Sequence, residues 1–206
     1  MLDVLGKSTS INVRKVLWLL QVLGLDYRHL GADGSHSSDA AALQSRNPNG
    51  LVPVIRDGDF VLWESNSICR YLAARAQRDD LLPQEAQARA RVEQWMDWQA
   101  TDLNTAWRYV FMSRVRQHPG YSDEAAAEAS LSQWNRLMQQ LDQRLADTGA
   151  YVTGPVFTLA DIVLGLSAQR WFMTPGEKPD LPAVQAWFER LAGHAGFDQH
   201  CRNGIP

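Results

Sequence analysis

Cysteine is scarce in this chain, and its two copies, Cys69 and Cys201, lie far apart in the sequence. No C-x-x-C pair occurs, so the pattern excludes a disulfide framework, a cysteine-ligated zinc site and a dithiol redox motif. We interpret both residues as incidental thiols, and we expect no bound metal.

Long hydrophobic runs are also missing. The longest apolar runs, such as Val16–Leu20, are far too short to span a bilayer. The opening residues, MLDVLGKSTS, contain an acidic residue and no extended apolar stretch, so no signal peptide is evident. We therefore expect a cytoplasmic protein that does not bind a membrane.

The chain has no excess of basic charge. It contains 20 Lys and Arg against 23 Asp and Glu, and its net charge of −3 gives no electrostatic reason to expect a nucleic-acid partner. The remaining composition is ordinary for a globular protein, with 45% hydrophobic and 21% charged residues. A length of 206 residues suits one large domain or two small ones.

Two kinds of hydrophobic pattern divide the chain. Residues 1–78 alternate in the order strand, helix, strand, loop or loose helix, two strands, helix. A strand–helix–strand start implies a parallel pair, and the hairpin signal Asp57-Gly58-Asp59 adds an antiparallel pair, so we expect a mixed sheet. Residues 79–83 are predicted to be a linker, and residues 84–206 an all-helical domain. The predicted fold class is α/β plus all-α.

One helix start is well specified. Thr158 and Asp161 have the spacing of a capping box, with Asp in place of the usual Glu, and Phe157 and Ile162 have the spacing of a hydrophobic staple. We interpret this motif as structural, because capping carries no chemistry.

Residues 47–55, NPNGLVPVI, combine a turn with a strand that contains Pro53, which has no N–H to give to a sheet. A cis Val52–Pro53 bond would turn the chain and leave the backbone of Val52 as an unpaired edge. An extended peptide can bind such an edge by β-addition. The alternative is an edge-strand proline without a ligand.

Two further segments offer groups for an amino-acid ligand. In WESNSI, Ser65 is predicted to be the N-cap of a helix whose free N–H groups can receive a carboxylate, while Glu64 can meet an ammonium. In the first strand-to-helix turn, GKSTSINVRK, Ser10 and Asn12 can donate to an anion. Ordinary helix capping is the alternative in both places.

The sequence and spacing of four motifs resemble the cytosolic glutathione transferases, most closely the bacterial serine-type (theta- or nu-like) members. These motifs are S-x-N-V-R-K-V (10–16), N-P-N-G-L-V-P-V-I (47–55), W-E-S-N-S-I-x-R-Y-L (63–72) and F-T-L-A-D-I (157–162). The resemblance implies a thioredoxin-like domain with a mixed four-stranded sheet, residues 1–78, followed by a helical bundle that holds the electrophile site, residues 84–206. It also implies glutathione as co-substrate, a homodimer and a detoxification role.

The resemblance assigns glutathione-binding roles to four residues. Val52 would pair through its backbone with the cysteinyl part of glutathione, beside cis-Pro53. Glu64 and Ser65 would hold the γ-glutamyl group. No clear basic residue is present for the glycyl carboxylate, although His36 or Arg46 could serve, and the final GHAGFDQH lacks the usual Arg-Pro of the family.

The resemblance also assigns the reacting groups. Ser10 aligns with the serine that faces the glutathione sulfur, and Asn12 is a second donor nearby. The first turn has no tyrosine and position 10 is not cysteine, which argues against tyrosine-type and mixed-disulfide chemistry. Trp107 and Phe111 belong to an aromatic cluster that would line the electrophile pocket, with core packing as the alternative.

The function implied is that of a glutathione transferase, which activates bound glutathione as a thiolate for attack on an apolar electrophile. Two alternatives stay open at this point. One is a non-catalytic binding or regulatory protein that keeps the glutathione fold. The other is a glutathione-dependent peroxidase or disulfide reductase.

Overall fold

The computed structural model describes residues 1–35 and 43–206, and its chain divides into two compact units. Unit 1 comprises Met1–Leu82 and a late segment, Gly193–Asn203. Unit 2 comprises Pro83–Ala192 and the last residues, Gly204–Pro206. The candidate glutathione-binding residues therefore all belong to unit 1, and the candidate electrophile-binding residues belong to unit 2.

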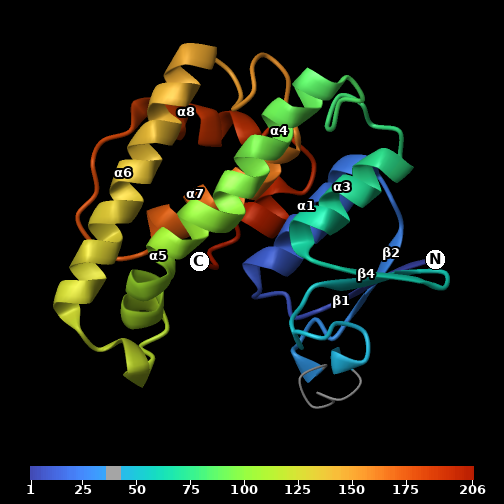
Figure 1. Cartoon of the computed structure of the whole chain (residues 1–206), viewed down its shortest axis with the longest axis horizontal. Helices are drawn as coiled ribbons and strands as arrows, with labels where there is room; N and C mark the ends of the chain where they lie inside the picture. Colours follow the sequence, from blue (N-terminus) through green and yellow to red (C-terminus); the bar gives the residue numbers. More distant parts are fainter. Residues whose placement is uncertain (36–42) are drawn as a thin grey trace. The chain divides into compact units, whose positions relative to one another are not determined.

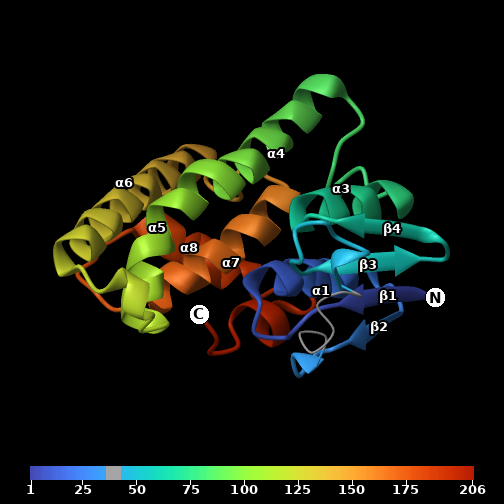
Figure 2. The ribbon, with the colours of Figure 1, turned by 60° about the horizontal axis from the view of Figure 1, so that its bottom comes forward.

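Unit 1 is built on a four-stranded sheet, which confirms the predicted mixed sheet. Its strands are β1 (Leu2–Leu5), β2 (Tyr27–Leu30), β3 (Val54–Asp57) and β4 (Phe60–Trp63). They lie in the order β2-β1-β3-β4, as Figure 2 shows. Strand β1 is parallel to β2 and antiparallel to β3, and β3 is antiparallel to β4. The predicted hairpin turns at Gly58, whose φ of +62° suits glycine.

Two helices of unit 1, α1 (Ile11–Leu23) and α3 (Ser65–Arg75), pack against each other (Figure 1). The predicted apolar face of α1 is buried; its members are Val13, Val16, Leu17 and Leu20. Helix α1 ends at Gly24, which adopts the left-handed conformation of a C-cap and confirms the predicted stop.

The segment Gly193–Asn203 packs in unit 1, although the sequence assigned it to a helical domain of residues 84–206. It contains η5 (Phe197–Cys201), a π-helical turn that contacts α1. The Phe197 ring meets the Trp18 ring edge-on at a centroid distance of 5.4 Å. Gly196 has a φ of +81°, and a Cβ there would lie only 2.6 Å from the Cβ of Gln21. Packing against α1, which no local periodicity reveals, thus overrides the domain boundary expected from the sequence.

Unit 2 is helical throughout its regular structure. Its longer helices are α4 (Ala86–Trp98), α5 (Asn104–Val110), α6 (Glu124–Thr148), α7 (Leu159–Met173) and α8 (Pro182–Leu191). The π-helical turns η2 (Gln99–Leu103) and η3 (Phe111–Val115) continue α4 and α5, and a short 3-10 helix, η4 (Pro119–Tyr121), precedes α6. Helix α7 is buried on almost every side from Leu159 to Trp171, so it forms the centre of the unit.

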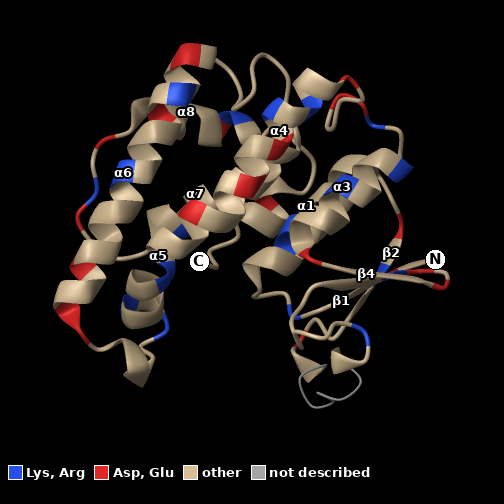
Figure 3. Cartoon of the chain, viewed as in Figure 1, with Lys and Arg blue, Asp and Glu red and all other residues tan. Residues whose placement is uncertain are grey.

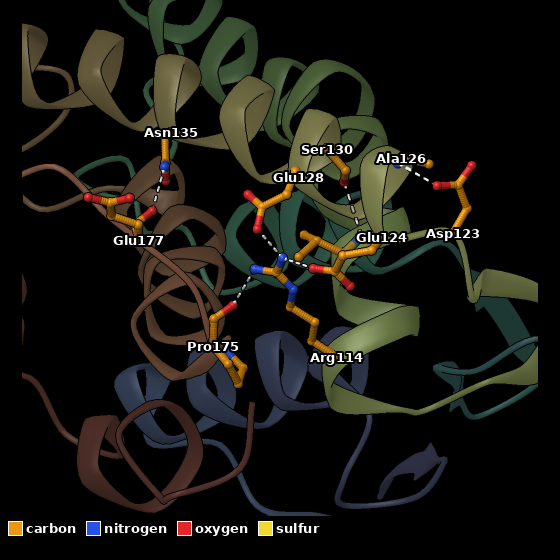
Figure 4. A network of polar contacts seen from close by, with 10 residues as sticks. Arg114, Asp123, Glu124, Ala126, Glu128, Ser130, Asn135, Pro175 and Glu177 are labelled. Atoms are coloured by element: carbon orange, nitrogen blue, oxygen red, sulfur yellow. Dashed lines mark hydrogen bonds and ion pairs between the residues drawn. The ribbon is translucent and has the colours of Figure 1, made fainter.

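One end of unit 2 is fastened by the guanidinium of Arg114 in η3 (Figure 4). Arg114 pairs with Glu124 and Glu128 of α6 and donates to the carbonyl of Pro175, at 3.3 Å. A Cβ at Gly176 would lie 2.7 Å from Nη1 of Arg114, so the loop after α7 requires a glycine there.

The surface carries charges of both signs on both units (Figure 3). Within residues 1–35 and 43–206, no helix has the length and the apolar character needed to cross a membrane.

The predicted capping box at the start of α7 is present, and its acidic member is fully buried. Oδ2 of Asp161 accepts from the N–H and the hydroxyl of Thr158, at 2.9 and 3.1 Å. Oδ1 accepts from the N–H of Val152 at 3.0 Å and from Nε1 of Trp187 at 2.9 Å. Burial raises the pKa of Asp161 to about 6. The carboxylate thus joins the start of α7 to α8 and to the preceding turn.

We expect Asp161→Ala to lower the free energy of unfolding by about 3 kcal/mol or more, because it leaves four buried donors without their acceptor. Urea denaturation followed by circular dichroism measures this change. Asp147→Ala, which removes an exposed carboxylate near the end of α6, is the control and should cost less than about 0.5 kcal/mol. Equal midpoints for the two variants would contradict the structural role of Asp161.

Candidate functional site

The loop before β3 presents Val52. The Val52–Pro53 bond is cis, as the sequence predicted. The loop is held by Asn47, whose side chain is buried. Nδ2 of Asn47 donates to the carbonyl of Leu51 at 2.8 Å, and Oδ1 accepts from the N–H of Asn49 at 3.0 Å. Sequence analysis treated Asn47 only as a turn residue, whereas the structure makes it the support of the Val52 loop.

Gly6 brings the first strand-to-helix turn directly against Val52. Its φ is +147°, and a Cβ built on it would lie 2.9 Å from the Cβ of Val52 and 2.5 Å from Cγ2 of Val13. No side chain fits in that space without moving one of these neighbours. The absence of a side chain at Gly6 therefore lets the turn that carries Ser10 and the loop that carries Val52 lie side by side.

Ser10 is the N-cap residue of α1, but its side chain makes no capping hydrogen bond. Both Ser10 and Asn12, in the first turn of α1, are half-buried. Among the described residues, neither side chain has a hydrogen-bond partner. Ser8 differs, because its hydroxyl donates to the carbonyl of Ala32 at 3.0 Å. The hydroxyl of Ser10 therefore remains available at the positive end of a helix.

Glu64 and Ser65 lie at the start of α3, with one correction to the predicted capping. The structure places Glu64 at the N-cap position and Ser65 at the first helical position, whereas the sequence predicted Ser65 as the cap. Glu64 is exposed and has a φ of +72°, a conformation that costs a non-glycine residue roughly 1–3 kcal/mol. Such strain often marks a binding site. Ser65 is buried, and Glu64 makes no side-chain cap bond to the helix.

A buried side-chain contact joins the two helices of the site. Nζ of Lys15 on α1 donates to Oδ1 of Asn66 on α3, at 3.3 Å, and both residues are buried. Asn66 directly follows Ser65, so this contact connects α1 with the first turn of α3. This pair could not be predicted from the sequence, because the two residues belong to separate motifs.

The end of β2 and the residues that follow it form hydrogen bonds to the first strand-to-helix turn. The N–H of Gly6 donates to the carbonyl of Leu30 at 3.0 Å, and the N–H of Ser8 donates to the carbonyl of Ala32 at 2.9 Å. Nε2 of His29 lies 2.7 Å from the carbonyl oxygen of Gly6. The sequence predicted the strand from its alternation but assigned no role to His29.

The late segment of unit 1 contacts α1. The buried guanidinium of Arg14 donates to Oδ1 of Asn203 at 2.9 Å. His200 is buried, and its Nε2 has no hydrogen-bond partner in the described part of the chain. Burial lowers the pKa of His200 to about 4, and the proximity of the Arg14 guanidinium acts in the same direction. His200 is therefore neutral at pH 7.

Neither cysteine can act as a nucleophile at neutral pH. Both thiols are buried, and burial raises the pKa of Cys69 to about 12 and that of Cys201 further still. In the part of the chain that the structure describes, no group of His, Cys, Asp and Glu side chains could hold a metal ion.

The two candidate electrophile-pocket residues lie together in unit 2, around a buried arginine. The guanidinium of Arg170 stacks 4.4 Å from the ring centroid of Trp107 and 4.1 Å from that of Phe111. Phe111 is buried and Trp107 half-buried. Of the two candidates for the glycyl carboxylate, Arg46 is exposed and His36 lies outside the described residues.

Comparison with known proteins gives family matches over both units. Residues 5–80 match the family model of the glutathione S-transferase N-terminal domain, and residues 103–195 match that of the C-terminal domain. The chain is 36% identical over 197 residues to glutathione S-transferase GstB of Escherichia coli, which covers 93% of each protein. It is also 36% identical over 136 residues to human glutathione S-transferase theta-1, covering 63% of this chain and 55% of that one.

A solved structure resembles the whole chain. It is the theta class glutathione S-transferase of Xanthomonas axonopodis pv. citri with glutathione bound, which superposes with a TM-score of 0.89 at 36% identity. The match covers 100% of this chain and 99% of that one.

The depressed pKa of His200 predicts a pH dependence of stability. In the unfolded chain His200 has an ordinary pKa near 6.5, so between pH 6.5 and 4 the unfolded state binds more protons than the folded state. Stability from this group is present above pH 6.5 and is lost as the pH falls toward 4. The raised pKa of Asp161 acts in the opposite direction between about pH 4 and 6, so the two effects partly cancel in the wild type.

His200→Gln isolates the first effect. We expect the loss of unfolding free energy between pH 7 and pH 5 to be about 1–2 kcal/mol smaller in this variant than in the wild type. Urea midpoints at the two pH values give the comparison. Parallel losses in both proteins would show that His200 does not contribute.

Proposed function

Because this chain belongs to the glutathione S-transferase family and is a glutathione transferase, we propose an assignment of its substrates to the residues described above. The observation that carries the assignment is the hydroxyl of Ser10, which makes no capping bond at the N-terminus of α1 and belongs to the turn whose Gly6 lies against Val52. A donor in this position can face the sulfur of a peptide that is paired with Val52.

Glutathione is proposed to bind in an extended form beside Val52, in the loop that precedes β3. The backbone of Val52, beside cis-Pro53, pairs with the cysteinyl part. Ser65 and the N–H groups at the start of α3 receive the γ-glutamyl carboxylate, and the exposed Glu64 receives the ammonium. The positive φ of Glu64, a local strain, supports this binding role.

The proposed chemistry begins with ionisation of the bound thiol. A free thiol has a pKa of about 8.5, so only a few per cent is thiolate at neutral pH. A hydrogen bond from Ser10 and the dipole of α1 favour the anion, and a decrease of one pKa unit raises the thiolate fraction about tenfold. Ser10 donates to the sulfur and does not remove its proton, which leaves to solvent. The thiolate then forms a C–S bond with the electrophile, and the leaving group departs with its electron pair.

The electrophile is proposed to bind against the aromatic cluster of unit 2. The ring of Trp107 is half-buried and that of Phe111 is buried. The guanidinium of Arg170 stacks on both rings. Aromatic and apolar walls suit a broad class of apolar electrophiles.

One observation and one experiment bear on the two alternative functions. Since both protein thiols are buried and have raised pKa values, peroxide or disulfide reduction would have to proceed through the glutathione thiolate alone. A non-catalytic binding protein would be retained on immobilised glutathione but would fail to conjugate a panel of aryl halides and other electrophiles.

Ser10 and Ser65 should separate catalysis from binding. We expect Ser10→Ala to leave glutathione affinity nearly unchanged, to raise the pKa of the bound thiol by about one unit, and to lower the rate at neutral pH about tenfold. Ser65→Ala should mainly raise the KM for glutathione. Thiolate absorbance near 240 nm across a pH series reports the pKa, and steady-state kinetics report kcat and KM.

Asn12→Ala is the matched test of the competing donor. If Asn12→Ala shifts the pKa of the bound thiol and Ser10→Ala does not, the two roles are exchanged. If neither variant shifts it, backbone N–H groups of the turn hold the thiolate, and the assignment of Ser10 is wrong.

We also propose that the protein is a cytoplasmic homodimer in which unit 1 of one chain meets the helical unit of the other. Two large apolar side chains of unit 1 support this, since Leu51 is 64% and Phe60 47% exposed. Phe60 is followed by Val61, which is 37% exposed, and adjacent exposed apolar side chains favour an interface.

Sedimentation at micromolar concentration should therefore give twice the 23.1 kDa mass of the chain. Leu51→Glu should shift the equilibrium toward monomer, because it places a charge in the interface. A wild-type mass near that of one chain would refute the dimer.

A further inference from the structure

We infer that His29 is a positioning residue of the active site, whose imidazole holds the turn that carries Ser10 by a hydrogen bond to the carbonyl of Gly6. The inference rests on the proposed role of Ser10 at the glutathione sulfur. It assigns a function to a side chain on β2, outside the motifs that identify the site.

The chemistry of the contact fixes which atom donates. The carbonyl oxygen of Gly6 can only accept a hydrogen bond, so Nε2 of His29 must carry the hydrogen. Both the neutral Nε2–H tautomer and the imidazolium satisfy this requirement, so the bond forms in either protonation state. At 2.7 Å it is shorter than the three other bonds from the turn to β2 and the residues that follow it, which measure 2.9 to 3.0 Å.

The position of Gly6 makes this bond consequential. Gly6 lies where the turn is closest to Val52 and Val13, with less room than a methyl group requires. Four residues later the chain reaches Ser10, whose N–H donates back to the carbonyl of Lys7 at 3.0 Å. Because the turn is short and internally bonded, a shift of the Gly6 peptide moves both the Ser10 hydroxyl and the surface that supports Val52.

His29 supplies a support that the sheet alone does not. Strand β2 is an edge strand that pairs only with β1, and its last residue is Leu30. The backbone ladder engages the N–H of Gly6, through Leu30, while His29 engages the carbonyl of the same residue. Thus β2 holds both polar groups of the Gly6 backbone. A displacement of about 1 Å at a reacting group can reduce a rate by as much as 100-fold, so this support bears on catalysis.

The test compares three variants of the full-length protein. His29→Leu removes the donor, and His29→Gln retains an N–H that can reach the Gly6 carbonyl. Tyr27→Phe is the control, because Tyr27 precedes His29 by two residues on the same face of β2 and its hydroxyl has no hydrogen bond among the described residues. Each protein is assayed for glutathione affinity, for the pKa of the bound thiol by absorbance near 240 nm, and for kcat and KM. Amide hydrogen exchange of residues 6–10 is measured without ligand.

In His29→Leu we expect at least threefold faster exchange at Ser8 and Ser10, a rise of about half to one unit in the pKa of the bound thiol, and a threefold to tenfold lower kcat. The KM for glutathione should change less than kcat does, because the start of α3, which is proposed to hold the γ-glutamyl group, is untouched. His29→Gln should recover most of the rate, and Tyr27→Phe should match the wild type in every assay.

Two results would overturn the inference. One is an unchanged exchange rate of the turn in His29→Leu. The other is a thiol pKa and kcat that are unchanged in His29→Leu although the wild-type protein conjugates glutathione. Failure of the proposed function has a different signature, since the wild type itself would then show no thiolate absorbance and no turnover. If His29→Leu does not fold, His29→Phe takes its place. A wild-type rate in His29→Phe, or a rate in His29→Gln no higher than a lowered rate in His29→Phe, would reject the role of the N–H.

Discussion

The close approach of Gly6 to Val52 is the constraint on which the rest of the site depends. It brings together a turn at the end of β1 and a loop before β3, two segments that are separated by about half of unit 1 in the sequence. The distances of 2.5 and 2.9 Å that a Cβ at Gly6 would make to Val13 and Val52 are shorter than real side-chain contacts. The missing side chain thus lets the turn that carries Ser10 lie against the loop that carries Val52. Asn47 on one side and His29 on the other keep the two segments in place.

The side-chain capping of helix N-termini differs between the two units. In unit 2, α4 begins at Glu85, whose carboxylate accepts from two backbone N–H groups, and α6 begins at Asp123, which accepts from the N–H of Ala126. In unit 1, α1 and α3 begin at Ser10 and Glu64, and neither side chain makes a capping bond. Both residues have the polar groups needed to cap, so their side chains are held away from the helix. Helix N-termini that are left uncapped in this way are suited to bind the thiolate and carboxylate of an anionic peptide.

Much of the fold could be predicted from the sequence, because the patterns that indicate its elements are local. Period and turn residues predicted the mixed sheet, the apolar face of α1 and the capping box of α7, and the family motifs indicated Ser10, Val52, Glu64 and Ser65. The remainder depends on tertiary contacts. Glutamate rarely adopts a positive φ, so the sequence does not indicate this conformation at Glu64. For this reason the N-cap was predicted at Ser65, one residue after its actual position at Glu64. The role of His29 and the packing of residues 193–203 on α1 join segments that no periodicity relates.

The buried contact between Lys15 and Asn66 gives the site an electrostatic bias. A cation close to a helix N-terminus is unfavourable, because the helix dipole is positive at that end. Lys15 reaches the second residue of α3 and lowers the cost of a negative charge in that region, as its opposing effect on the raised pKa of Cys69 shows. In the proposed binding mode, the γ-glutamyl carboxylate lies near this ammonium and the N–H groups at the start of α3. The proposed thiolate is held by separate donors at α1. Affinity and reactivity would then depend on two different helix ends.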